Sequence, residues 1–407
     1  MKEQKHRKHA LADGLRGMPK DVWVVGIVSF LMDVSSESIH SLLPLFMVNT
    51  LGVSVLAVGI IDGFAEATTN IVKVFSGSIS DYLRKRKALA VAGYGLSALS
   101  KPLFPLATNV TQVVAGRVAD RVGKGIRGAP RDALMADIVP AHMRGAAFGL
   151  RQSLDTAGAF TGPILAVVLM SVTNGNFRTV FWVATIPAIL SVLFLGFGVQ
   201  EPAATRTSSS TRPPLRWSAL KSFSRQYWWV VAIGGVFTLA RFSEAFLVLR
   251  AQNLGLQASV VPVVMIVMNI AYALSAYPAG VLADRISHRS LLAAGLVVLI
   301  LADVALAFAT GKPVLFAGVL LWGLHMGLTQ GLLSAMVAGC APERLRGTGF
   351  GFFNLVSGIA VLPASAIAGL LWTRIGPSAT FLCGGAFAVL TLFAVIGTMR
   401  PRANSDR

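Results

Sequence analysis

Pro140-Ala-His-Met-Arg144-Gly145-Ala-Ala-Phe148-Gly149 returns later in the chain as Pro342-Glu-Arg-Leu-Arg346-Gly347-Thr-Gly-Phe350-Gly351. A second stretch, Gly77-Ser-Ile-Ser-Asp81, returns as Gly280-Val-Leu-Ala-Asp284. The two repeats are offset by 202 and 203 residues, so separate motifs recur at nearly one spacing. Recurrence at a fixed offset indicates internal duplication. The sequence therefore predicts two structurally related halves.

Long apolar segments surround these motifs. Hydrophobic residues make up 54% of the 407 residues, charged residues make up 13%, and the mean hydropathy is +0.67. This charged share is about half that of a soluble protein and leaves too little polar surface for a soluble chain of this length. Apolar runs of roughly 20 residues can cross about 30 Å of hydrocarbon as helices.

We predict an all-α integral membrane protein with twelve transmembrane helices in two pseudo-symmetric six-helix bundles. The predicted spans are 21–48, 55–80, 88–107, 111–133, 146–171, 178–198, 227–249, 259–283, 290–310, 313–336, 348–372 and 377–399.

The basic residues gather in alternate loops, although the net charge of +18 by itself might suggest a nucleic-acid partner. Loops rich in Lys and Arg stay in the cytoplasm, which favours a membrane topology over nucleic-acid binding. We predict an inner (cytoplasmic) membrane location with both termini in the cytoplasm. The predicted parts are a cytoplasmic tail at 1–20, a six-helix bundle at 21–198, a cytoplasmic linker at 199–226, a second bundle at 227–399 and a cytoplasmic tail at 400–407.

Ionisable residues lie inside several predicted spans of the first half. They are Asp33 and Glu37; Asp62, Glu66 and Lys73; Arg117, Asp120, Arg121 and Lys124; and Arg151 and Asp155. Such residues are expensive at bilayer depth and usually face a cavity or a partner. In the fourth span, cations recur at i, i+4, i+7 and i+14 from Arg117 to Arg131, which is one side of a helix. We expect this column to line a water-filled path or to pair with Asp33, Glu37 and Glu66. The group is a candidate substrate and proton-coupling site, or else a static salt-bridge network.

The repeated glycine–aspartate motif and the basic residues that follow it resemble a signature of the major facilitator superfamily. In that signature a Gly is followed four residues later by Asp and then by basic residues, as in Gly280, Asp284 and Arg285. The first copy departs from the pattern, with Tyr82 where Arg is usual and Arg84 where Gly is usual. The resemblance covers nearly the whole chain and implies transport. Such a motif suits a cytoplasmic gate, with ordinary topology-setting charges as the alternative. The candidate gating residues are Gly77, Asp81, Arg131, Arg144, Gly280, Asp284, Arg285 and Arg346.

Two further motifs bear on mechanism through the same resemblance. Arg117 matches an arginine that is tied to proton transfer in the family, but Asp120 and Arg121 stand where Gln and Gly are usual. The stretch from Gly158 through Gly162 to Pro163 resembles the GxxxGP of antiporter-type members and favours export, or is a packing motif without direction.

The run Gly-Lys-Gly-Ile-Arg-x-Ala-Pro-Arg-Asp at 123–132 resembles a bacterial and archaeal branch, some members of which are associated with siderophores or iron handling.

Other patterns carry less weight. Gly123, Gly125 and Gly128 match a dinucleotide fingerprint, but no strand precedes them, so we expect them to allow close helix packing. His325 is either a proton or substrate site or the donor of one structural hydrogen bond. Met265 and Met268 might touch a metal but are typical core fillers. No enzyme motif or phosphate loop is present, so we expect no catalytic activity, cofactor or resident metal.

We therefore predict a secondary transporter of a small solute, acting as a monomer in the lipid bilayer by alternating access, coupled to protons, and more an exporter than an importer. Several cations in the first half favour an anionic or zwitterionic solute, although drug-like cations could bind Asp33, Glu37 and Glu66. Alternatives are transport of a metal or metallophore such as a siderophore, a non-transporting membrane sensor, and a membrane-embedded enzyme.

Overall fold

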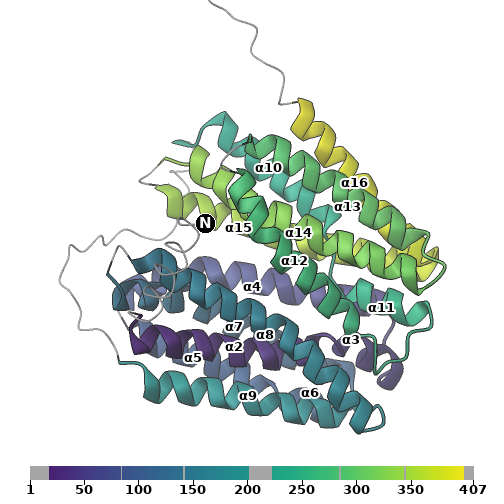
Figure 1. The fold of residues 1–407 in the computed structure, drawn as a ribbon, viewed down its shortest axis with the longest axis horizontal. Coiled ribbons are helices and arrows are strands. Elements are labelled where there is room, and N and C mark those ends of the chain that lie inside the picture. The colour runs from purple at the N-terminus through teal and green to yellow at the C-terminus, as the bar shows by residue number, and fades with distance from the viewer. Residues whose placement is uncertain are drawn as a thin grey trace, which may run out of the picture. The chain divides into compact units, whose positions relative to one another are not determined.

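The computed structural model describes residues 18–83, 85–140, 143–200, 222–283, 286–342 and 345–397, and every regular element in those ranges is a helix. The elements are α2 (Lys20–His40), α3 (Leu43–Leu45), η1 (Phe46–Thr50), α4 (Val55–Leu83), α5 (Arg86–Ser100), α6 (Leu103–Leu106), α7 (Val110–Ile138), α8 (Arg144–Val172), α9 (Phe177–Gly198), α10 (Arg225–Ala240), α11 (Ala245–Asn253), α12 (Val263–Ala283), α13 (His288–Ala307), α14 (Lys312–Cys340), α15 (Arg346–Arg374) and α16 (Pro377–Gly397). In the described part of the chain they form twelve consecutive segments, and Figure 1 shows them as long rods.

Ten of these segments are long and apolar enough to cross a membrane, counted over the described residues. The other two are the third segment, α5 with α6, and the fourth, α7. The third is divided into two short helices, and the fourth carries buried charged side chains such as Arg117 and Asp120. Buried charge, rather than length, therefore sets the fourth segment apart from the ten.

Three predicted spans are interrupted in the structure, which the sequence reasoning did not anticipate. The first segment breaks between His40 and Leu43, the third at Lys101-Pro102, and the seventh between Ala240 and Ala245. Proline accounts for the third break because it cannot donate a helical hydrogen bond. At the seventh break the Ser243 hydroxyl accepts a hydrogen bond from the Ala245 N–H (3.1 Å) in place of a helical carbonyl.

Polar caps fix where several helices begin. The side-chain oxygens of Asn109, Asn176, Ser224 and Ser287 each accept a hydrogen bond from the backbone N–H three residues later, at 3.1–3.2 Å. These contacts satisfy N–H groups that the first turn of a helix leaves without partners.

Two arginines bind backbone carbonyls at helix ends on the non-cytoplasmic side of the predicted topology. Arg178 donates to the carbonyls of Pro105 and Ala107 (2.5 and 2.8 Å), at the end of α6. Arg250 donates to the carbonyls of Leu306, Ala307 and Ala309 (3.0, 3.2 and 2.9 Å) at the end of α13. Both cations satisfy backbone carbonyls that lack helical donors.

Contacts between residues divide the chain into two compact units. Unit 1 is Met1–His40 with Phe75–Pro213, and unit 2 is Ser41–Val74 with Pro214–Arg407. The segment Ser41–Val74 belongs to the first half of the sequence but clusters with helices of the second. The domain boundaries that we derived from the sequence stay a prediction.

The same helix pairings occur in both units, as internal duplication requires. In unit 1, α2 packs on α8 and α9, and α5 packs on α7 and α9. In unit 2, α10 packs on α15 and α16, and α13 packs on α14 and α16. These helices correspond one to one when the halves are aligned in chain order. The duplication read from the repeated motifs is thus reproduced in the packing.

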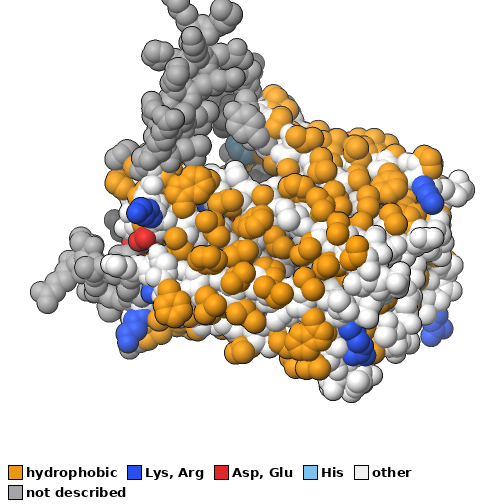
Figure 2. All heavy atoms as spheres, turned by 60° about the horizontal axis from the view of Figure 1, so that its bottom comes forward, with side chains coloured by type: hydrophobic (Ala, Val, Ile, Leu, Met, Phe, Trp, Pro, Cys, Tyr) orange, Lys and Arg blue, Asp and Glu red, His pale blue; other side chains and the backbone are white. Residues whose placement is uncertain are grey.

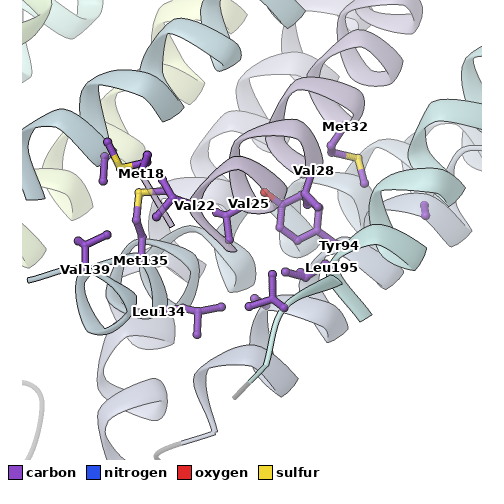
Figure 3. Close-up of a cluster of buried hydrophobic side chains, with 14 of the residues drawn as sticks. Met18, Val22, Val25, Val28, Met32, Tyr94, Leu134, Met135, Val139 and Leu195 are labelled. Atoms are coloured by element: carbon purple, nitrogen blue, oxygen red, sulfur yellow. The ribbon is translucent and has the colours of Figure 1, made fainter. Parts of the chain in front are cut away.

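Unit 1 has an apolar core near the ends of α2, α5, α7 and α9. Figure 3 shows Val22, Val25 and Val28 of α2 facing Tyr94, Leu134 and Leu195 from the other three helices, all buried. Many large apolar side chains outside the cores are exposed, and hydrophobic side chains are spread over much of the face that Figure 2 shows. Such a surface suits a lipid environment and not water.

Glycines bring α5 and α7 into close contact. A Cβ atom on Gly93 would lie 2.7 Å from the backbone nitrogen of Arg127 and 2.8 Å from the carbonyl oxygen of Gly123. A Cβ atom on Gly123 would lie 2.6 Å from the Gly93 carbonyl oxygen. The predicted role of Gly123 in close packing is confirmed, because backbone atoms cannot move aside.

We expect Gly93→Ala to lower the free energy of unfolding by about 1–3 kcal/mol, because its methyl group would press against backbone atoms of α7. A thermal melt of the purified protein in detergent measures the effect. Gly95→Ala on the same helix is the matched control, since nothing lies within 4 Å of its Cβ position. Equal melting temperatures for the two variants would contradict the close packing.

Candidate functional site

Helix α7 carries a set of charged side chains into the interior of unit 1. Arg117, Asp120, Arg121 and Arg127 are each at most 4% exposed, whereas Lys124 is exposed. The buried side chains follow from the sequence spacing, since positions four apart share a helix face. Of the column predicted from Arg117 to Arg131, the structure therefore buries the first two members.

The most enclosed ion pair joins Lys101 to Asp120. The Lys101 ammonium donates to Asp120 Oδ1 (2.9 Å), and these side chains are 1% and 5% exposed. The same ammonium donates to the Ser36 hydroxyl on α2 (2.9 Å). Lys101 lies at the break between α5 and α6, which points its side chain across to α7. One cation therefore ties three membrane segments together.

A second chain of contacts joins α2 to α7 through a histidine. Arg117 hydrogen-bonds His40 Nε2, and His40 Nδ1 lies 3.7 Å from the Glu37 carboxylate. Glu37 and His40 are three residues apart at the end of α2, so they share a face. The imidazole thus stands between a guanidinium and a carboxylate.

Arg127 and Arg131 bind a group of hydroxyl and aromatic side chains. Arg127 donates to the Ser97 hydroxyl (2.5 Å), and its guanidinium lies 4.8 Å from the centre of the Tyr94 ring. Arg131 donates to the Ser29 hydroxyl (3.0 Å), which is 3.0 Å from the Tyr94 hydroxyl. Cation–π contact and hydrogen bonds together hold the two cations in fixed positions.

Helix α8 adds the predicted pair Arg151 and Asp155. Arg151 donates to Asp155 Oδ2 (2.5 Å), and Arg131 lies 3.9 Å from the same oxygen. The charges of Asp155, Lys124 and Arg127 act on Asp33 of α2. The carboxylates of α2 and α8 therefore belong to the same electrostatic cluster as the cations of α7.

The glycine–proline motif of α8 positions the carboxylates of α2. A Cβ atom on Gly158 would lie 2.9 Å from Asp33 Cβ, and one on Gly162 would lie 2.9 Å from Glu37 Cβ. Ser38 donates to the Gly162 carbonyl (2.9 Å). The motif is therefore a packing surface against the face of α2 that carries Asp33 and Glu37.

Cations outnumber carboxylates in this cluster. Its cations are Lys101, Arg117, Arg121, Lys124, Arg127, Arg131 and Arg151, and its carboxylates are Asp33, Glu37, Asp120, Asp132 and Asp155. With His40 neutral, the excess is two positive charges. An environment of this kind attracts anions.

The family model described as Major Facilitator Superfamily matches residues 25–249 and 238–407. The chain belongs to the major facilitator superfamily. It is therefore a multi-pass membrane protein of a transporter family and not of an enzyme family. The two consecutive matches agree with the repeated motifs and the repeated helix pairings.

Named relatives agree with the family. An uncharacterised MFS-type transporter of Methanocaldococcus jannaschii is 32% identical over 382 residues, covering 92% of this chain and 94% of its own. The multidrug resistance protein MdtH of Cronobacter sakazakii is 26% identical, covering 82% and 81%. A crystal structure of a mutant of the nucleoside transporter NupG shares the fold, with a TM-score of 0.77 at 14% identity over 93% of this chain and 100% of that one.

Other predicted site residues of this transporter lie in unit 2. Asp62, Glu66 and Lys73 are on the part of α4 that clusters there, so their grouping with the α7 cations stays a prediction. Asp62 is buried and accepts a hydrogen bond from the Ser243 hydroxyl (2.7 Å) at the break between α10 and α11. His325 is fully buried against Trp322, and Met265 and Met268 are buried in the apolar core.

The proposed gate is described only in part. Asp284 and Arg285 lie outside the described residues, as do the surroundings of Gly77 and the side chains of Asp81 and Arg346. Gly280 is exposed on α12, and Arg144 is exposed at the start of α8. In the neighbouring basic run, Arg86 binds Asp137 of α7, and Lys87 donates to the Gly196 carbonyl (2.8 Å). The partners of both cations, Asp137 and the Gly196 carbonyl, therefore lie within unit 1.

Lys101 and His40 are the main site residues that sequence reasoning missed. Lys101 is a single cation inside an apolar predicted span, which is itself a signal of function or pairing. His40 lies three residues after Glu37, within the same predicted span. Arg127, Tyr94 and Ser97 were missed because only the packing of α5 on α7 brings them together.

We expect Lys101→Met to lower the free energy of unfolding by about 3–5 kcal/mol, because it leaves the Asp120 carboxylate buried without its cation. The double variant Lys101→Met with Asp120→Leu should recover most of that loss, since it removes both charges. Thermal melts of the wild type and all three variants complete the double-mutant cycle. Additive losses from the two single variants would show that the ion pair does not couple them.

Proposed function

We propose that this transporter exports a small anionic or zwitterionic solute by alternating access, driven by protons. The observation that carries the proposal is the excess of two cations in the cluster around α7. A bound anion would compensate that excess and would be favoured over a cation of the same size. Arg117 and Arg121 offer planar donors that suit a carboxylate or phosphate group.

Support for proton coupling comes from the contact of His40 with Arg117 and Glu37. A neutral imidazole can accept a hydrogen bond from Arg117, but a protonated one repels the guanidinium and favours Glu37. Gaining one proton at His40 would therefore change the partner of Arg117. A freed guanidinium could then bind the anionic solute, which links proton binding to solute binding.

Support for export comes from two sources. The Gly158 to Pro163 stretch resembles the antiporter motif of the family, and here it packs against the face of α2 that carries Asp33 and Glu37. The relative in Cronobacter sakazakii is named a multidrug resistance protein. We further propose a monomer in the inner membrane with both termini in the cytoplasm.

The run at 123–132 suggests a narrower alternative, in which the solute is a metal or a metallophore such as a siderophore. Many metal chelators carry carboxylates, so this solute would also suit a cationic cluster. A solute panel with and without added iron separates the two forms of the proposal.

The test uses purified protein in liposomes that enclose a pH-sensitive dye. We expect dicarboxylates, sugar phosphates, amino acids or iron chelators, but not the cation ethidium, to trigger proton movement. Arg117→Gln should slow the response at least about tenfold, because it removes both the anion donor and the partner of His40. Lys312→Gln, an exposed cation outside the cluster, is the matched control.

Two outcomes would contradict this proposal. An unchanged rate in Arg117→Gln would remove the α7 cluster from the mechanism. A response to ethidium alone would reverse the charge preference and leave the fold assignment intact.

A further inference from the structure

Helix α13 in unit 2 carries a carboxyl group far from the cluster in sequence. Asp303 is 0% exposed, and neither of its carboxyl oxygens has a hydrogen-bond partner among the described residues. No cation in the described part of the chain donates a hydrogen bond to it. An ionised carboxylate in such surroundings carries a large desolvation cost that nothing offsets.

A glycine lies directly against this carboxyl. A Cβ atom built on Gly384 of α16 would lie 3.2 Å from Asp303 Oδ2, 3.3 Å from the Ala240 carbonyl oxygen and 2.7 Å from the Phe242 ring. The Gly384 backbone therefore packs against the carboxyl, the carbonyl and the ring together. A side chain at this position would force the ring to move, because a contact under 3.0 Å is too close.

The carbonyl belongs to a helix end. Helix α10 stops at Ala240, and the chain is not helical again until Ala245. The C-terminal end of a helix carries partial negative charge, and broken helices in transporters use such ends to bind coupling cations. A buried carboxyl and a helix C-terminus therefore lie against the same glycine in unit 2.

We propose that Asp303 binds a proton and that it is a proton-coupling site of the second half. The proposal rests on the proton-driven transport put forward above. A proton removes the charge of the buried carboxyl, and the partial negative charge of the nearby helix end favours that neutral form. A metal ion needs more oxygen ligands, and the described residues contain no group of three metal-binding side chains.

Other ionisable groups lie on the helices around Asp303. His325 on α14 is edge-on to Trp322 (5.3 Å between ring centres), and Trp322 in turn packs against Phe242. Arg241 lies over the Phe237 ring and interacts with the charge of Glu244, and Arg250 is held by the carbonyls at the end of α13. The Cys383 thiol on α16 is a further titratable group near the carboxyl. None of these groups donates a hydrogen bond to Asp303.

The proposed proton site adjoins the interruption of the seventh membrane segment. Residues 241–244 are not helical, and they include Ser243, the donor to Asp62. Displacement of Ala240 or Phe242 would change the surroundings of Asp303 and expose the carboxyl. Proton loss would then follow the movement of this break, as coupled transport requires.

Infrared spectroscopy of the wild type in lipid at neutral pH tests proton binding without any solute. We expect a protonated carboxyl band that is absent from Asp303→Asn and retained in Asp33→Asn. Replacing choline with sodium at constant pH should leave the band unchanged. A band that persists in Asp303→Asn, or that sodium removes, would overturn the proposal.

Gly384→Ala tests the surroundings of the carboxyl without removing it. Its methyl group would press on the Phe242 ring and lie beside Asp303, so the carboxyl band should shift and solute-driven proton movement should fall about tenfold. Gly397→Ala on the same helix is the control, since nothing lies within 4 Å of its Cβ position. An unchanged band in Gly384→Ala would contradict the shared site.

The two proposals fail in different ways. A band that depends on Asp303 without any solute-driven proton movement would keep the proton site and reject the proposed coupling. Proton movement that survives intact in Asp303→Asn, with the band unaffected, would keep the proposed coupling and reject Asp303 as its carrier.

Discussion

An ionised side chain inside a membrane protein is tolerated only where a partner or water compensates its charge, and unit 1 is organised around that requirement. Lys101 shows it most plainly. Its ammonium reaches Asp120 and Ser36 from the end of α5, where the helix breaks before Pro102. The break, the buried pair and the position of α7 beside α2 depend on one another. The other cations of α7 are placed around this pair.

Small residues make such a charged interior possible because they let helices approach closely. Gly93 and Gly123 bring α5 against α7, while Gly158 and Gly162 bring α8 against α2. Close approach shortens the distance between ionisable groups on neighbouring helices, and in a low-dielectric interior this strengthens their attraction. The motif that resembles an antiporter signature thus has a direct physical role in placing two carboxylates.

Unit 2 handles buried charge in another way. Its cations Arg241 and Arg250 are held by an aromatic ring and by backbone carbonyls, and Asp303 stands apart from both. The two halves therefore share a fold but differ in chemistry, with a cluster of many charges around α7 in one and a buried carboxyl that lacks a described hydrogen-bond partner in the other. Such asymmetry suits a division of roles between solute binding and proton binding.

The amino-acid sequence alone determined the family, the twelve segments and the duplication, because hydrophobic length and repeated motifs are local or periodic signals. It also identified the ionisable residues of α2, α7 and α8, because charges stand out in apolar runs. Only the tertiary structure decided which side chains are partners: Asp120 binds Lys101, and His40 lies between Glu37 and Arg117. It also decided that Ser41–Val74 clusters with the second half. Those facts depend on helix breaks and on contacts between residues distant in sequence. The surroundings of a carboxyl such as Asp303 can likewise be described only once the neighbouring helices are placed.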